Sequence, residues 1–194
     1  MALTTLDAGT ALVVIDLQNG LRHAPTAPYP VPEVITRTAE LADAFRAHGA
    51  PVFLVRVTGA PDGWDATPGR NETPSASRAR PEGWDQVVPE LAGHPEDITV
   101  TKRTWGAFHG TDLDLLLRRR GITQIVVTGV ATSIGVESTA RAAHEHDYHV
   151  TLATDAMTDL DAEAHRNSVE RIFPRLGERG TAAEIIELLA RTRP

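Results

Sequence analysis

The chain has 194 residues, of which 41% are hydrophobic and 23% are charged, and this composition predicts a single globular domain over residues 1–194. Its formal net charge of −7 argues against a nucleic-acid partner, because nucleic acids are bound by clustered Lys and Arg. The chain contains no cysteine, which excludes disulfides, thiolate metal sites and a thiol nucleophile.

The N-terminal sequence MALTTLDAGTALVVID lacks the basic segment that opens a signal peptide. No apolar run approaches the roughly 18 residues that a membrane-spanning helix requires. We therefore expect no contact with a membrane and a cytoplasmic location.

Apolar runs rich in β-branched residues alternate with helical patterns along the chain. The runs predict strands at 11–16, 51–57, 98–101, 124–130 and 149–154. The helical patterns predict helices at about 33–47, 85–92, 111–120, 134–146, 161–172 and 182–191. Because continuous apolar strands between helices are buried on both faces, we expect an α/β/α three-layer sandwich around a six-stranded, mainly parallel, Rossmann-like sheet.

Two irregular stretches are predicted to line a pocket. Residues 19–32 follow the first strand and contain four prolines, and residues 59–83 are rich in Pro, Gly, Asp and Ser without periodicity. In doubly wound sheets ligands bind beyond the carboxyl ends of the strands. Long loops inside compact domains are typically lids or mobile segments, so the second stretch is a candidate lid.

Two charged residues end predicted strands at this same edge of the sheet, Asp16 after the first and Lys102 after the third. A desolvated carboxylate there can serve as a general acid or base, and a cation beside it lowers its pKa and can stabilise an oxyanion. Taken singly, Asp16 fits a strand-end cap and Lys102 a solvated side chain. Their placement on neighbouring strands favours a functional pair.

The segment VTGVATSIGVESTAR at 127–141 leads from a strand into a helix through small residues. Backbone N–H groups at such a turn can bind an anion, although tight packing of the turn needs the same small residues and is the commoner explanation. The hydroxyls of Thr132, Ser133 and Ser138 have no histidine base nearby in the sequence. Thr132 and Ser133 are therefore predicted to cap the helix start.

Three separated segments resemble the isochorismatase-like superfamily, which includes isochorismatases, nicotinamidases and N-carbamoylsarcosine amidase-like hydrolases. They are ALVVIDLQNG at 11–20, TKRTWGAFHGTDLDLLLRRRGI at 101–122 and VVTGVATSIGVESTARAAHEHDYHVTLATDAM at 126–157. The resemblance implies an Asp-Lys-Cys triad in which Asp16 and Lys102 are present and Gly135 stands at the cysteine position. It also implies a cis peptide between Val130 and Ala131.

The glycine removes the route by which amidases of this superfamily form an acyl-enzyme on cysteine. Isochorismatases that cleave a vinyl ether also carry glycine there, and their aspartate is thought to protonate the enol-ether carbon. Those enzymes have Tyr-Ala-His before the glycine, where this chain has Ala131-Thr132-Ser133. The motif is more similar to a subgroup that has lost the cysteine, and the coherent IGVES sequence favours a natural glycine over a substituted cysteine.

We therefore expect a hydrolase of a small molecule that works without a covalent intermediate, with Asp16 as general acid or base and an isochorismate-like vinyl ether as a candidate substrate. The alternative is a catalytically silent protein that binds a metabolite or acts through assembly. The expected substrate-binding residues are Gln18, Trp105, Phe108, Val130, Ala131, Thr132 and Ile134. Trp105, Phe108 and Trp64 could instead fill the core or a subunit interface.

No cofactor and no catalytic metal are predicted. Where nicotinamidases carry an Asp-x-His metal pair, this chain reads VRVTGAPDGWD, and His144 and His146 are spaced to point to different helix faces. Arg56 could bind a substrate carboxylate or pair with an acidic loop residue. The resemblance further implies a homo-oligomer.

Overall fold

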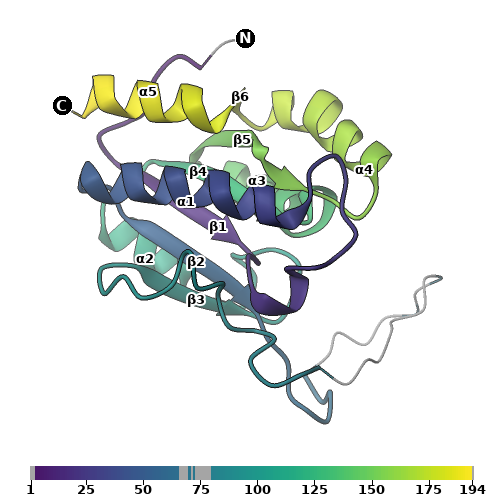
Figure 1. The fold of residues 1–194 in the computed structure, drawn as a ribbon. Coiled ribbons are helices and arrows are strands. Elements are labelled where there is room, and N and C mark those ends of the chain that lie inside the picture. Colours follow the sequence, from purple (N-terminus) through teal and green to yellow (C-terminus); the bar gives the residue numbers. More distant parts are fainter. Residues whose placement is uncertain (1–2, 66–69, 71, 73–79, 194) are drawn as a thin grey trace.

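A computed structural model describes residues 3–65, 70, 72 and 80–193. It contains a sheet of six strands in the order β3-β2-β1-β4-β5-β6, and every neighbouring pair is parallel (Figure 1). The strands are β1 (Thr10–Ile15), β2 (Val52–Val57), β3 (Ile98–Lys102), β4 (Gln124–Val130), β5 (His149–Thr158) and β6 (Glu178–Gly180). The order reverses between β1 and β4, which is the switch point of a doubly wound fold.

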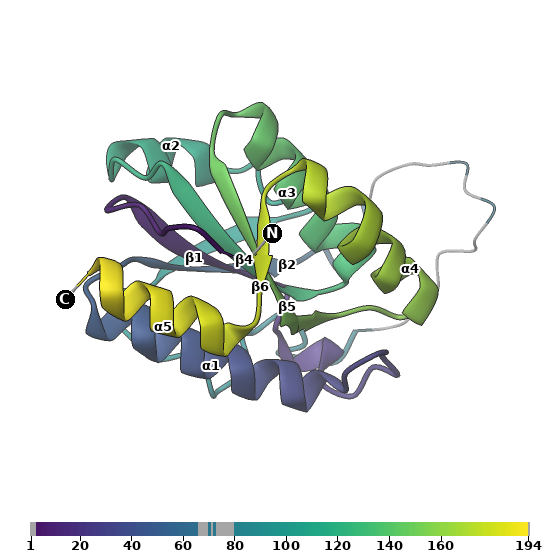
Figure 2. The ribbon, with the colours of Figure 1, turned by 90° about the horizontal axis from the view of Figure 1, so that it is seen from above.

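Helices cover both faces of the sheet. They are α1 (Val31–Ala47), α2 (Leu113–Arg119), α3 (Glu137–Glu145), α4 (Ala162–Asn167) and α5 (Ala182–Thr192). Shorter 3-10 segments span Asn19–Leu21 and Phe173–Arg175, and π-helical turns span Thr132–Val136 and Ser168–Ile172. Figure 2 shows α1 and α5 on one face and α2 and α3 on the other, which confirms the three-layer α/β/α prediction. No helix among the described residues has the length and apolarity to cross a membrane.

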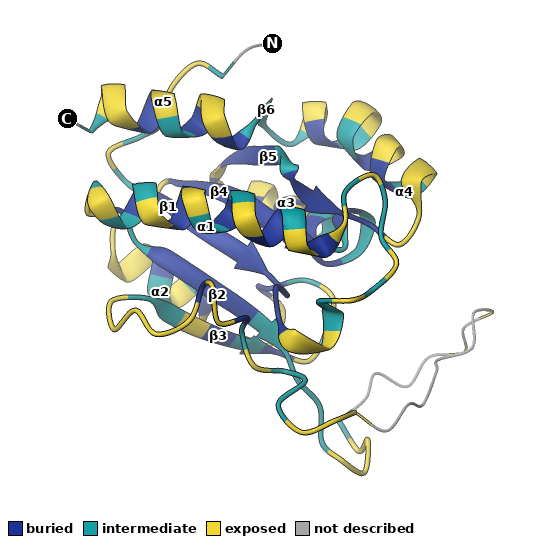
Figure 3. Ribbon diagram, in the orientation of Figure 1, coloured by how far each residue is buried: buried dark blue, intermediate teal, exposed yellow. Residues whose placement is uncertain are grey.

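The core has two halves, one on each side of the sheet. Along β1, Leu12 and Val14 pack with side chains of α1 and α5, whereas Val13 and Ile15 pack with side chains of α2 and α3. This alternation follows from the two-residue period of a strand. Because helices cover both faces of the sheet, every residue of β1 is buried (Figure 3). This burial explains why the sequence of β1 is almost entirely apolar.

The six-stranded sheet is confirmed, but one predicted helix was wrong and one strand was not located. The segment 85–92 is not helical, because its backbone pairs with the segment after β1: the N–H of Asn19 donates to Gln86 O at 2.9 Å and the N–H of Val88 donates to Leu17 O at 3.1 Å. The strand β6 was not predicted, because its three residues are too few for a pattern. It forms by pairing with Thr151–Ala153 of β5.

A close approach between β1 and β4 brings the carboxyl ends of these strands together. Gly129 has φ +121°, and a Cβ at this position would lie 2.0 Å from the carbonyl oxygen of Ile15. Only glycine fits such a contact. The peptide bond between Val130 and Ala131, one residue further along the chain, is cis, as the resemblance implied. Gly129 thus sets the turn that follows β4 directly beside Asp16.

Replacing Gly129 by alanine is expected to lower the free energy of unfolding by more than about 3 kcal/mol, or to prevent folding, because the methyl group would overlap backbone. The matched control is Gly49→Ala, which also has a positive φ (+65°) but no atom within 4 Å of the added Cβ. That change should cost only about 1 kcal/mol. Chemical denaturation measures both. Equal losses in the two variants would contradict the close approach.

Candidate active site

Asp16 lies at the carboxyl edge of the sheet, directly after β1. Its backbone has φ +53°, an uncommon conformation for a residue with a side chain, and its N–H donates to Val55 O at 2.9 Å. The residue is 6% exposed and lines a cavity of about 410 Å³. The structure thus places a buried carboxyl group in a cavity at the switch point.

Lys102 ends β3 and is the only lysine in the chain, since the rest of the 19 lysine and arginine residues are arginine. It is 2% exposed, and its Nζ donates to Asp16 Oδ2 at 2.7 Å and to Thr104 O at 3.0 Å. The expectation of neighbouring strands was wrong, because β2 lies between β1 and β3. The long lysine side chain spans that gap with a compact cation, which a forked guanidinium would not reproduce.

The surroundings of Asp16 shift its acidity toward neutrality. Burial raises the pKa of Asp16 to about 6, while the charge and hydrogen bond of Lys102 act in the opposite direction. The second carboxyl oxygen, Oδ1, is buried and has no hydrogen-bond partner among the described residues. Asp16 therefore has an unused polar atom and a pKa suited to proton transfer near neutral pH.

Gly135 faces this carboxyl group from the π-helical turn. A Cβ at residue 135 would lie 3.4 Å from Asp16 Oδ2 and 3.0 Å from Ile15 Cγ2. The hydroxyl of Thr139 holds the turn, because it donates to Gly135 O at 2.7 Å and accepts from the N–H of Ala107 at 3.1 Å. A side chain at residue 135 would begin beside Asp16, and glycine leaves that space to a substrate or water.

The structure brings most of the predicted site residues to this one cavity. Together with Asp16, Lys102 and Gly135, the wall includes Trp105, Val130, Ala131 and Ile134. Trp105 is 67% exposed, so it borders the opening and does not fill the core. The carboxyl ends of β1, β3 and β4 therefore supply one continuous site.

Three of the predicted substrate-binding residues are not among those that line the cavity. Gln18 is turned to β2, where its Oε1 accepts from the N–H of Val57 at 2.9 Å and its Nε2 donates to Val57 O at 3.1 Å. Phe108 stacks on His146 with ring centroids 5.2 Å apart. Thr132 is fully buried, and its hydroxyl lies 2.8 Å from His165 Nδ1. Each of these three side chains thus contacts another part of the fold and is not part of the cavity wall.

Sequence reasoning missed the polar cluster behind the turn. Asp159 follows β5 and is 2% exposed, and its Oδ2 accepts from the N–H of Ser133 at 2.6 Å. His165 of α4 is buried, and burial lowers its pKa, so the imidazole beside Thr132 is neutral near pH 7. The position of Asp159 directly after a strand was the signal that could have identified it. His165 gave no such signal, because α4 brings it to Thr132 from 33 residues away.

Sequence reasoning also missed the basic wall of the cavity. Arg80 and Arg103 both line it. Arg103 Nε donates to Asp65 Oδ2 at 2.6 Å, whereas the Arg80 guanidinium lies 4.0 Å above the ring of Trp84. Asp65 and Arg80 belong to the predicted 59–83 loop, of which residues 66–69, 71 and 73–79 lie outside the described residues. The described ends of that loop thus contribute charge to the cavity.

The two remaining candidates, Trp64 and Arg56, do not line the cavity. Trp64 is 78% exposed and is not part of the cavity wall. Arg56 pairs with an acidic loop residue, since its Nη1 lies 3.5 Å from Asp85 Oδ2. Among the described residues, no three His, Cys, Asp or Glu side chains gather in a way that could hold a metal ion.

Comparisons with known proteins identify the family of this chain. The sequence profile of the isochorismatase domain matches residues 10–184. The chain is 46% identical over 180 residues to the uncharacterized isochorismatase family protein YecD of Escherichia coli O157:H7, covering 93% of this chain and 96% of that protein. It is 31% identical over 183 residues to the ureidoacrylate amidohydrolase RutB of Variovorax paradoxus, covering 80% and 71%.

A solved structure agrees with the sequence comparisons. An isochorismatase family protein from Burkholderia thailandensis superposes with a TM-score of 0.92 at 46% identity, and the match covers 96% of this chain and 98% of that one. With the domain profile matched over most of its length, the chain belongs to the isochorismatase family of hydrolases.

Proposed function

We propose that this chain hydrolyses a small molecule without a covalent intermediate and that Asp16 transfers the proton. The observation that carries the proposal is the buried Asp16–Lys102 pair directly opposite Gly135, in a chain without cysteine. Of the Asp-Lys-Cys triad that the resemblance implies, Asp16 and Lys102 are paired and the cysteine is absent. The space at residue 135 accommodates water or a larger substrate.

An isochorismate-like vinyl ether is the substrate we propose. The protonated carboxyl of Asp16 donates its proton to the enol-ether carbon, which leaves an oxocarbenium ion and a carboxylate paired with Lys102. Water adds to the cation and loses a proton to the carboxylate, and the resulting hemiketal collapses to a carbonyl compound and an alcohol. A pKa of about 6 leaves roughly one molecule in ten protonated at pH 7, which is enough for this acid to act.

The basic wall supports a substrate that carries a negative charge. The Arg80 guanidinium lies over the ring of Trp84, and a cation–π contact of this kind does not use its N–H donors. Guanidinium groups bind carboxylates through paired hydrogen bonds. We propose that a carboxylate of the substrate contacts Arg80 and that Trp105 covers its apolar part.

A second candidate is cleavage of an amide by an activated water. It is favoured by the 31% identity to a ureidoacrylate amidohydrolase, which the vinyl-ether proposal does not explain. In this case the ionised carboxylate of Asp16 would act as a base on water in the space beside Gly135. The two candidates require opposite protonation states of Asp16, so the pH dependence of turnover separates them.

The exposed apolar side chains of Trp105 and Leu160 lie beside the cavity opening. They support the further proposal that copies of the chain associate as a homo-oligomer. A silent binding protein remains the alternative to a hydrolase, and the absence of the nucleophile motivates it.

The Asp16 carboxyl should titrate with a pKa of about 6. The change Lys102→Met should raise this pKa further, because it removes the cation that favours the charged form. Carbon-13 NMR of the aspartate carboxyl groups measures both values. Arg103→Gln is the matched control, since it removes a cation that pairs with Asp65 instead. An unchanged or lower pKa in Lys102→Met would contradict the assigned pairing.

Turnover of isochorismate should fall as pH rises above about 6 if Asp16 is the acid. The change Asp16→Asn should lower kcat/KM by roughly a hundredfold or more, which is the usual contribution of a general acid. Asp97→Asn is the control, because Asp97 is also a buried, ion-paired carboxylate but lies at the other edge of the sheet.

The same assay is run with ureidoacrylate and N-carbamoyl compounds. Amide turnover that rises through pH 6 and depends on Asp16 would favour the water-activation candidate. Undiminished isochorismate turnover in Asp16→Asn would overturn the acid mechanism. If none of these substrates is turned over, the hydrolase proposal gives way to the silent binding protein.

The change Gly135→Cys should place a single reactive thiol beside Asp16 and Lys102, in a chain that otherwise has none. The cation of Lys102 favours the thiolate, so alkylation by iodoacetamide at pH 7 should slow by roughly tenfold in the double variant Gly135→Cys/Lys102→Met. Mass spectrometry of the labelled protein measures the rate. A rate that does not change when Lys102 is replaced would show that the turn does not face the pair.

A further inference from the structure

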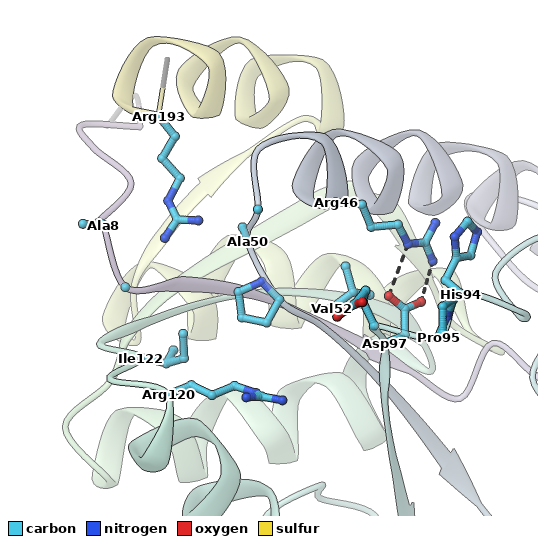
Figure 4. Close-up of a pocket in the computed structure, with 14 residues that line it drawn as sticks. Ala8, Arg46, Ala50, Val52, His94, Pro95, Asp97, Arg120, Ile122 and Arg193 are labelled. Atoms are coloured by element: carbon cyan, nitrogen blue, oxygen red, sulfur yellow. Dashed lines mark hydrogen bonds and ion pairs between the residues drawn. The ribbon is translucent and has the colours of Figure 1, made fainter.

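A second cavity lies at the opposite edge of the sheet from Asp16 (Figure 4). We call it the amino-edge cavity, because it opens where β1 and β2 begin. Its volume is about 660 Å³, and it shares no lining residue with the cavity at Asp16. Its main lining residues are Arg46, Ala50, Val52, Arg120, Ile122 and Arg193.

The fold itself brings three arginines to this cavity. In a doubly wound sheet the helices run opposite to the strands, so α1, α2 and α5 all end at the amino edge. Arg46 lies in the last turn of α1, and Arg120 and Arg193 directly follow α2 and α5. A cation at a helix C-terminus is favoured by the helix dipole. Three separate helix ends thus contribute positive charge to one hollow.

Two of these arginines have no acidic partner among the described residues. Arg46 is neutralised, since its guanidinium lies 2.6 Å from Asp97 and 2.8 Å from Asp43. Among the described residues, no ion pair or side-chain hydrogen bond involves the guanidinium of Arg120 or of Arg193. Glu96 also lines the cavity but lies within 4.0 Å of neither guanidinium. This unneutralised positive charge stands in a chain of net charge −7.

The backbone at both arginines is held in place. The N–H of Arg193 donates to Leu189 O at 2.9 Å, and His48 Nδ1 donates to Arg193 O at 2.6 Å. The N–H of Arg120 donates to Leu117 O at 3.1 Å. Figure 4 shows the side chain of Arg193 beside Ala50 and that of Arg120 further down, beside Ile122. The backbone of both arginines is therefore fixed, so only their side chains have to be ordered when a ligand binds.

The floor between the arginines is apolar. Ala50 and Val52 are at most 4% exposed, and Ile122 is 7% exposed. A volume of several hundred cubic ångström is typical of small-molecule sites, which combine apolar walls with a few polar groups. A fully hydrated inorganic ion would gain nothing from such a floor. An organic anion with an apolar body would use both features.

We propose that the amino-edge cavity binds a small organic carboxylate. Its acid group is held by the guanidinium groups of Arg120 and Arg193, through the paired hydrogen bonds that guanidinium forms with carboxylate, and its apolar body rests on Ala50, Val52 and Ile122. The alternative is that both arginines serve only to stabilise their helix ends. This inference is independent of the activity proposed for Asp16.

Benzoate is the probe, and benzamide is its uncharged counterpart of the same shape. Titrations of nitrogen-15 labelled protein by NMR should show benzoate shifting the amide signals of Gly9, Gly49 and Ile122, residues that line the cavity. Benzamide should bind roughly tenfold more weakly. Arg120→Gln and Arg193→Gln should each weaken benzoate binding by roughly tenfold, as the loss of one charge-assisted pair predicts.

Matched controls are Arg119→Gln and Arg191→Gln, which remove the same charge from the same helices at exposed positions outside the cavity. Both should bind benzoate as the unmodified chain does, and so should Arg80→Gln, which removes a cation from the cavity at Asp16. Equal binding of benzoate and benzamide would overturn the proposal. So would equal losses in the control and cavity variants, or loss of binding in Arg80→Gln, which would assign the benzoate to the other cavity.

Discussion

The buried ion pair between Asp16 and Lys102 is the interaction on which the carboxyl edge of this protein depends. Taking two charges out of water costs several kcal/mol per ion, and only close pairing and further hydrogen bonds offset that cost. Lys102 Nζ meets the requirement through Asp16 and Thr104, whereas Asp16 Oδ1 has no protein partner in the described part of the chain. The hydrogen bonding of the pair is complete on the lysine side and incomplete on the aspartate side, where one buried oxygen lacks a partner.

The turn after β4 is built to bring backbone close to that incomplete carboxyl group. Gly129 lets β4 approach β1, and Gly135 then leaves the volume beside Asp16 without a side chain. Behind the turn, Thr132 contacts His165, and Asp159 accepts from Ser133. These buried polar contacts come from three parts of the chain and hold one face of the turn, so the other face is free to meet a ligand.

The two edges of the sheet carry different charged side chains, and the direction of the strands and helices explains both sets. Parallel strands place all their carboxyl ends at one edge, where Asp16, Lys102 and Asp159 gather. The helices that return between the strands place their own C-terminal ends at the other edge, where Arg46, Arg120 and Arg193 gather. A doubly wound fold therefore separates the Asp16–Lys102 pair from a cluster of cations by the length of its strands.

The sequence by itself determined the sandwich, five of the strands and the strand-end positions of Asp16 and Lys102, because strand periodicity and strand ends are local patterns. Gly135 was identified only through the resemblance to the isochorismatase-like superfamily. Only the tertiary structure decided that β2 separates Asp16 from Lys102, that 85–92 pairs with the segment after β1, and that β6 exists. It also decided that the side chains of Gln18, Phe108 and Thr132 turn away from the cavity. Their directions depend on partners distant in the chain, which no local pattern records.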